Sequence, residues 1–179
     1  SLADVFEDRK ELWPWRQDLF SMIGNTPYLD WLLLTKRPEN ISDMVAEVTG
    51  GYLNIADFEN IWIGTSVENQ EQADKRIPHL LNVPAKVRFL SCEPLLSSVD
   101  LDLAHWQGTL WHGGGIQWVI AGAESGHGAR PMDTDWVRDL RDQCQAAAVP
   151  FFFKQMIAEG KKVELPALDG AVWAQFPKG

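Results

Sequence analysis

Short runs of apolar residues alternate along the chain with segments whose apolar residues recur every three or four positions. A short apolar run bounded by turn residues is typical of a buried strand, and recurrence at three and four positions is typical of an amphipathic helix. The runs predict strands within residues 30–38, 60–69, 87–94, 118–122 and 150–155. Helical spacing covers residues 12–25, 38–48, 73–81 and 136–147. The alternation predicts the α/β class.

The predicted strands end at nearly constant intervals. The ends fall near positions 4, 35, 66, 91, 122 and 154, so the intervals are 31, 31, 25, 31 and 32 residues. Repeated βα units of about thirty residues imply parallel strands with right-handed crossovers. No G-x-G-x-x-G follows a first strand and no Walker motif is present. The sequence therefore favours a partial (β/α) barrel over a doubly wound sheet.

The two ends of the chain and one internal segment depart from this rhythm. The chain opens with Ser1 at what resembles a strand end, so we expect at least one N-terminal βα unit to be missing. Residues 95–117 contain a glycine triplet and predict a long irregular loop. We assign the partial barrel to residues 1–158 and a C-terminal appendage, with a short hairpin around Asp169 and Gly170, to residues 159–179.

Composition narrows the class of protein. A chain of 179 residues is long enough for one domain with a buried core. The formal net charge of −9 argues against a basic nucleic-acid-binding surface over the whole domain, although a locally basic cleft stays open. No stretch approaches the apolar length of a membrane helix, and no signal peptide is visible, so we expect a cytoplasmic protein without membrane contact.

Cysteine and histidine usage gives no sign of a metal site. Cys92 and Cys144 form no CxxC pattern, which indicates free thiols. The four histidines show no metal-ligand spacing. No metal ligand is therefore predicted in this chain.

Three glutamates follow the apolar cores of consecutive strands, at Glu68, Glu93 and Glu124. In a parallel barrel all three would lie at the carboxyl ends of the strands, where ligands bind. One glutamate after a strand is most often a solvated turn residue, but repetition in three consecutive units weakens that interpretation. Glu124 stands in the stretch 118–131, where an apolar run breaks into a glycine-rich turn.

Three cations follow other predicted strands, at Lys36, Arg37 and Lys154. Carboxylates accept hydrogen bonds from hydroxyl and ammonium groups, and cations pair with carboxylate or phosphate. An edge of the sheet that carries both kinds of group suits a small zwitterionic molecule. The three cations are candidate substrate-binding residues, and no catalytic residue is assigned.

Longer blocks of sequence resemble a known family. They read L-L-L-T-K-R-P at 32–38, W-I-G-T-S-V-E-N-Q at 62–70, V-R-F-L-S-C-E-P-L-L at 87–96, E-S-G at 124–126, A-R-P-M at 129–132 and V-P-F-F-F-K-Q at 149–155. In this order they resemble a radical-SAM-like family of unknown function from phages, prophages and bacteria, distinguished by three cysteines near its N-terminus.

The resemblance implies a partial (β/α) barrel, a [4Fe–4S] cluster and S-adenosylmethionine bound at the strand ends. It also implies that strand-end polar residues contact the cofactor. The candidate cofactor-binding residues are Ser66, Glu68, Asn69, Glu93 and Glu124.

This chain departs from the family because it lacks the cysteine triplet, which in the family precedes the segment matching Ser1. Iron–sulfur clusters need thiolate ligands, and Cys92 and Cys144 do not replace closely spaced cysteines. We therefore expect a fragment of a radical-SAM-like enzyme of unknown substrate, contributing the barrel and the ligand-facing strand ends. The fragment alone is expected to be inactive and to retain neither cluster nor S-adenosylmethionine.

Two other functions fit the same pattern. One is a non-catalytic, barrel-derived binding module that assists a partner protein of a phage or mobile element. The other is a barrel hydrolase or lyase that uses Glu68, Glu93 and Glu124 as acid and base. An incomplete barrel also leaves an open strand edge, which favours dimerisation or poor solubility.

Overall fold

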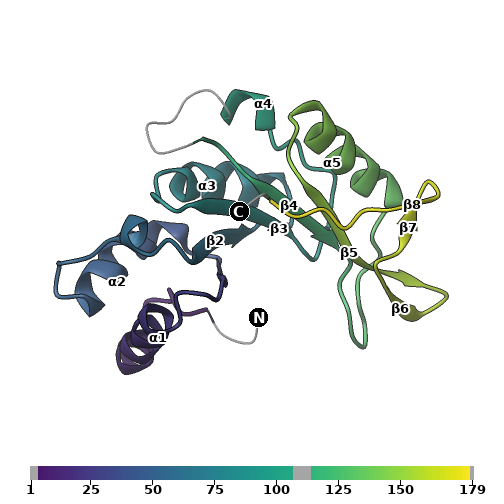
Figure 1. The fold of residues 1–179 in the computed structure, drawn as a ribbon. Coiled ribbons are helices and arrows are strands. Elements are labelled where there is room, and N and C mark those ends of the chain that lie inside the picture. The colour runs from purple at the N-terminus through teal and green to yellow at the C-terminus, as the bar shows by residue number, and fades with distance from the viewer. Residues whose placement is uncertain (1–3, 107–113, 178–179) are drawn as a thin grey trace.

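The computed structural model of the chain describes residues 4–106 and 114–177 (Figure 1). A six-stranded sheet, in the order β1-β2-β3-β4-β5-β6, curls into a half-barrel. Strands β1 to β5 are parallel, and β6 is antiparallel to β5. The strands are β1 (Trp31–Thr35), β2 (Ile61–Ser66), β3 (Val87–Cys92), β4 (Trp118–Gly122), β5 (Phe151–Ala158) and β6 (Lys161–Glu164). The predicted α/β class and the parallel strands are confirmed.

The helices connect these strands. They are α1 (Trp13–Asn25), α2 (Ile41–Val48), α3 (Gln70–Leu81), α4 (Leu103–Trp106) and α5 (Thr134–Ala146), with 3-10 turns at Lys10–Leu12, Pro38–Asn40 and Ile55–Asp57. Side-chain caps fix two of the starts, since Asn69 accepts the N–H of Gln72 at 3.0 Å and Asp133 accepts the N–H of Asp135 at 2.9 Å. None of the described helices has the length and apolar character needed to cross a membrane.

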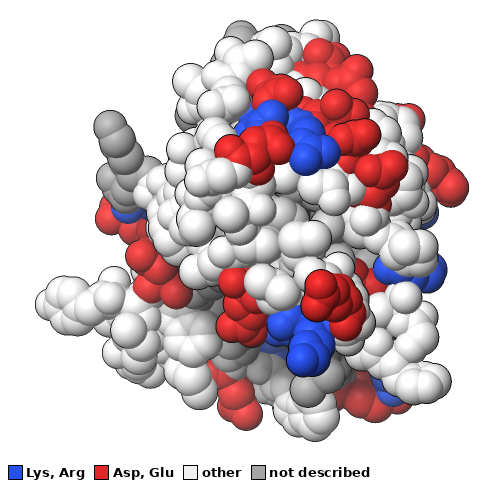
Figure 2. All heavy atoms as spheres, turned by 90° about the vertical axis from the view of Figure 1, so that its right-hand side faces the viewer, with Lys and Arg blue, Asp and Glu red and all other residues white. Residues whose placement is uncertain are grey.

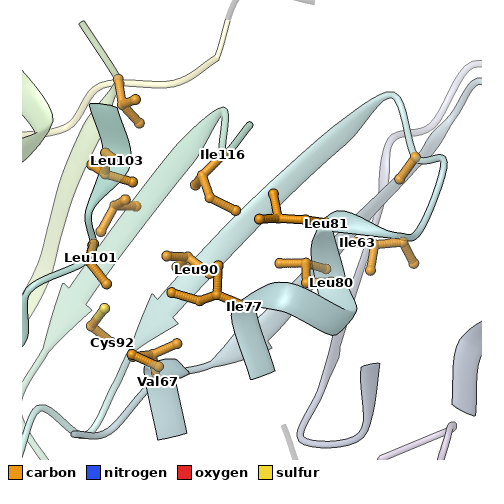
Figure 3. Close-up of a cluster of buried hydrophobic side chains, with 14 of the residues drawn as sticks. Ile63, Val67, Ile77, Leu80, Leu81, Leu90, Cys92, Leu101, Leu103 and Ile116 are labelled. Carbon is orange, nitrogen blue, oxygen red and sulfur yellow. The ribbon is translucent and has the colours of Figure 1, made fainter. Parts of the chain in front are cut away.

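The helix-covered face of the sheet holds the larger core. Alternate strand residues such as Ile63 and Leu90 meet the apolar side of α3 at Ile77 and Leu80 (Figure 3). Every residue of β2 and of β3 is buried, so both faces of these two strands are covered, as is typical of parallel strands. Burial on both faces requires apolar cover on the second face as well.

That second face carries a smaller aromatic core. Trp62, Val87, Phe89 and Trp118 are buried there, and Leu34, Ile120 and Phe152 pack against them half-buried. The ring of Trp118 lies 5.8 Å from that of Phe89 and 5.9 Å from that of Phe152, between centroids. The Phe89 ring occupies the space that a side chain on Gly64 would fill. These residues form the aromatic floor of the concave face.

Arg88 is a charged residue inside the helix-side core. Its guanidinium donates to the carbonyl oxygens of Val83 at 2.8 Å, Ala85 at 3.3 Å and Gly115 at 3.3 Å, and also to that of Gly114. Buried carbonyl groups need hydrogen-bond partners. Arg88 therefore joins the turn before β3 to the residues that lead into β4.

The C-terminal residues cover the outer edge of β5. β6 pairs with the second half of β5. Along the first half of β5, the Phe153 N–H donates to the Trp173 carbonyl at 2.8 Å, and the Gln175 N–H donates to the Phe151 carbonyl at 3.1 Å. Phe176 packs on Trp118, 5.2 Å between ring centroids. The predicted boundary after residue 158 falls inside the β5–β6 pairing and stays a prediction.

A short hairpin of β7 (Ala167–Leu168) and β8 (Ala171–Val172) turns at Asp169 and Gly170, as predicted. Arg138 and Arg141 of α5 hold the Asp169 carboxylate at 3.0 and 2.6 Å. Figure 2 shows acidic and basic side chains mixed together on this side of the molecule, rather than a basic patch.

Two predicted segments lie partly outside the described residues. Within the predicted loop at 95–117, residues 95–106 and 114–117 are described, and apart from the four-residue helix α4 these are irregular; residues 107–113, with His112 and the first glycine of the triplet, are not described. Residues 1–3, which belong to the predicted first strand end, also lie outside the described residues. Asp4 itself is in no strand; its carboxylate accepts the Thr35 hydroxyl at 2.7 Å and the Lys36 N–H at 2.9 Å.

Candidate functional site

A cavity of about 590 Å³ opens on the concave face of the sheet. One part is the aromatic floor, with Phe89, Trp118 and Phe152. The other part is polar and lies at the carboxyl ends of the strands, where the cavity is lined by Ser91, Glu93, Glu124, Ser125, Lys154 and Gln155. Small-molecule sites are concave and largely apolar, with a few converging polar groups. The concave cavity has this form.

Glu93 is the centre of the polar part. Its carboxylate accepts Lys154 Nζ at 3.0 and 3.2 Å and Gln155 Nε2 at 2.9 Å. The donors belong to β5, two strands away from β3, and they reach across β4 at Gly122. A Cβ on Gly122 would lie 3.3 Å from the side chains of both Glu93 and Gln155, so glycine leaves room for this contact.

Glu124 forms a separate ion pair beside the cavity. Arg130 Nε and Nη2 each donate to its carboxylate at 2.7 Å, and the Arg130 N–H donates at 2.9 Å. These hydrogen bonds lower the pKa of Glu124 to about 2. The turn between the two residues contains Gly126 and Gly128, whose φ values of 111° and 77° favour glycine.

Glu68 is the most enclosed of the three glutamates. Lys36 Nζ lies 2.6 Å from Oε1, and Arg76 Nη1 lies 2.7 Å from Oε2. Burial alone would raise the pKa of Glu68, but the hydrogen bond from Lys36 and the charge of Arg76 outweigh it and lower the pKa. Arg76 Nη1 also donates to the Ser66 carbonyl at 2.8 Å.

The structure therefore brings together only part of the predicted site. Glu93, Glu124 and Lys154 line the concave cavity. The other predicted residues, which lie at neighbouring strand ends and are not among its lining residues, are Lys36, Arg37, Ser66, Glu68 and Asn69. Arg37 faces the N-terminal segment, with its guanidinium 3.7 Å from Asp4 and 3.4 Å from Glu7.

Several lining residues were not predicted. Gln155 directly follows a predicted site lysine, and Ser125 directly follows a predicted site glutamate, so adjacency was the available signal. Phe89 and Phe152 gave no such signal, because apolar residues within a strand predict packing on either face.

The charge state of the carboxylates favours binding over acid catalysis. The pKa values of Glu68 and Glu124 lie below the ordinary value for glutamate, so both side chains are ionised at neutral pH. An ionised carboxylate accepts hydrogen bonds and pairs with cations, but it holds no proton to donate.

The thiols of this chain do not fit an iron–sulfur cluster. Cys92 is fully buried beside Val67 and Leu101, on the helix side of the sheet (Figure 3). Burial raises the pKa of both thiols, that of Cys144 to about 12, which is typical of inert structural cysteines. Within residues 4–106 and 114–177, no three His, Cys, Asp or Glu side chains are grouped to hold a metal ion.

Comparisons with known proteins identify a family. A family model described as a protein of unknown function, DUF5131, matches residues 1–177. No curated protein and no solved structure matches the chain. Since the family match spans almost the entire chain, the protein belongs to the DUF5131 family of proteins of unknown function.

Proposed function

We propose that the chain forms the ligand-facing part of a radical-SAM-like enzyme and that its concave cavity binds S-adenosylmethionine. The observation that carries this proposal is the union, in one cavity, of an aromatic floor and the Glu93–Lys154–Gln155 cluster. S-adenosylmethionine likewise joins a planar heterocycle to a zwitterionic amino acid. Resemblance to the radical-SAM-like family supports the same ligand.

The fold supports a place in a larger (β/α) barrel built of repeated βα units. Strands β1 to β5 are parallel and are neighbours in space in the same order as in sequence. In barrels of this kind the ligand lies at the carboxyl ends of the strands. The polar part of the concave cavity is at that end, at Ser91, Glu93 and Glu124.

Each part of the cavity has a binding role in this proposal. The half-buried ring of Phe152 offers apolar contact to the heterocycle, and the buried rings of Phe89 and Trp118 form the base of the cavity beside it. The Glu93 carboxylate accepts hydrogen bonds from an ammonium or ribose hydroxyl group, and Lys154 pairs with the ligand carboxylate. Because the thiols present do not fit a cluster, the proposed binding involves no cluster-dependent step.

Lys154 is well placed to exchange partners. Its side chain is 50% exposed, whereas that of Glu93 is 19% exposed. Exposed ion pairs contribute about 0–1 kcal/mol, so turning the ammonium from Glu93 to a ligand carboxylate costs little. The enclosed Glu68–Arg76 pair is less free to exchange, since separating it would leave a charge uncompensated.

Binding can be tested by titrating S-adenosylmethionine into the purified chain while tryptophan fluorescence is recorded. We expect the chain to purify without ligand and then to bind with a dissociation constant between about 1 μM and 1 mM. Glu93→Gln and Lys154→Met should each weaken binding about tenfold, because each removes one charged contact.

Lys162→Met is the matched control, because Lys162 is an exposed lysine paired with Glu164 on β6, and it does not line the concave cavity. It should bind like the unmodified chain. Absence of saturable binding, or equal binding by all four proteins, would overturn the proposal.

A non-catalytic, barrel-derived binding module of a phage or mobile element is the second candidate. The buried thiols and the paired carboxylates favour it. The full-length gene product, reconstituted anaerobically with iron and sulfide, separates the two. Release of 5′-deoxyadenosine under reducing conditions supports the enzyme, whereas binding without release supports the module.

A further inference from the structure

A second, smaller cavity of about 250 Å³ lies next to the Glu124–Arg130 ion pair. The two cavities share Ala123, but Glu124 lines only the first and Arg130 only the second. The ion pair therefore joins one charged residue from the lining of each cavity. The Arg130 side chain is 57% exposed, so a ligand can reach its guanidinium.

The lining of this second cavity is apolar except for one cation. Met132, Met156 and Ile157 supply its larger side chains, and Arg130 is the charged residue among those described around it. Methionine side chains adapt to ligands of different shape because they are unbranched and flexible. An apolar cavity beside a guanidinium suits a molecule with an aliphatic part and a carboxylate, since the planar guanidinium binds carboxylates through two parallel hydrogen bonds.

Glu124 shows how such a carboxylate would bind. It already accepts hydrogen bonds from one pair of guanidinium donors, Nε and Nη2 of Arg130, at 2.7 Å each. Exposed ion pairs are weak in water, so a carboxylate that also buries an aliphatic group can replace Glu124. A Cβ on Gly126 or Gly128 would meet no atom within 4 Å, so nothing packs on the connecting turn at these two positions to resist a shift of Glu124.

We propose that this second cavity binds a small aliphatic carboxylate. The ligand carboxylate takes the place of Glu124 on Arg130, and its aliphatic part lies against Met132, Met156 and Ile157. This site goes beyond the proposed S-adenosylmethionine site, because Arg130, Met132, Met156 and Ile157 do not line the concave cavity and binding here does not require that cofactor.

The test uses isovalerate as the probe and calorimetric titration or ligand-detected NMR as the measurement. Arg130→Gln should weaken isovalerate binding at least about tenfold, because the cation is lost. Glu124→Gln should instead tighten it, by about tenfold, because it removes the competing carboxylate. Isobutylamine, which has a similar aliphatic part but a positive charge, should not bind.

The tighter isovalerate binding expected for Glu124→Gln distinguishes a binding site from a purely structural ion pair. If the ion pair only held the turn in place, both Glu124→Gln and Arg130→Gln would weaken binding. Glu164→Gln, which alters an exposed glutamate of β6 that pairs with Lys162, should leave isovalerate binding unchanged. The proposal is overturned if neither the unmodified chain nor Glu124→Gln binds isovalerate, or if Arg130→Gln binds it as well as the unmodified chain. Fluorescence titration with S-adenosylmethionine reports the concave cavity separately, so failure at one site is distinguishable from failure at the other.

Discussion

Replacing Gly64 with alanine is expected to destabilise the protein by about 3 kcal/mol, the upper part of the range for overpacked cores. A Cβ at this position would overlap the ring of Phe89 on the adjacent strand. The ring has little freedom to move, because Phe89 is buried and packs against Trp118. The free energy of unfolding, measured by urea denaturation, should report the loss.

Gly24→Ala provides the matched control, because no atom lies within 4 Å of a Cβ at this position in α1. Alanine is favoured over glycine in a helix, so this variant should be neutral or more stable by up to about 1 kcal/mol. Adding Phe89→Ala to Gly64→Ala should remove the overlap, so the double variant should be no less stable than Phe89→Ala alone. Equal stability of Gly64→Ala and the unmodified chain would contradict the packing described here.

Replacing Arg88 with methionine should destabilise the protein by at least about 3 kcal/mol. Methionine fills part of the same space but donates no hydrogen bonds. The carbonyl groups of Val83, Ala85, Gly114 and Gly115 would lose the guanidinium donor. Urea denaturation measures the total loss.

Arg9→Met is the control for removing an arginine from the surface. Arg9 is 61% exposed and lies 3.9 Å from Glu11, so its loss should change stability by less than about 0.5 kcal/mol. If Arg88→Met were as stable as Arg9→Met, the hydrogen bonds of Arg88 would not hold the two loops together.

The sequence predicted the main strands and helices because burial imposes a regular spacing on apolar residues. α3 and α5 have apolar residues at helical spacing, and β2 and β3 are buried throughout. β6 was missed for the opposite reason. Each of its residues is exposed, so its sequence carries no strand pattern, and its position follows from pairing with β5.

The strand-end position of the glutamates was predictable, but their partners were not. Glu68 pairs with Arg76 of a helix, and Glu93 pairs with Lys154 from a strand 61 residues later. Such contacts depend on how far each side chain reaches across the sheet, and spacing in the sequence does not encode that distance. The aromatic floor was hidden for a similar reason, since an apolar run does not show which face of the sheet a residue occupies.

Hydrogen–deuterium exchange with and without excess S-adenosylmethionine tests most directly whether the concave cavity is the ligand site. Peptides covering residues 89–96, 118–125 and 152–156 should exchange more slowly with ligand, because they line the cavity. Peptides from α2 should be unchanged, since α2 contributes no lining residue to that cavity. Slower exchange in α2 without any change in the three cavity segments, or no change anywhere at saturating ligand, would contradict the proposed site.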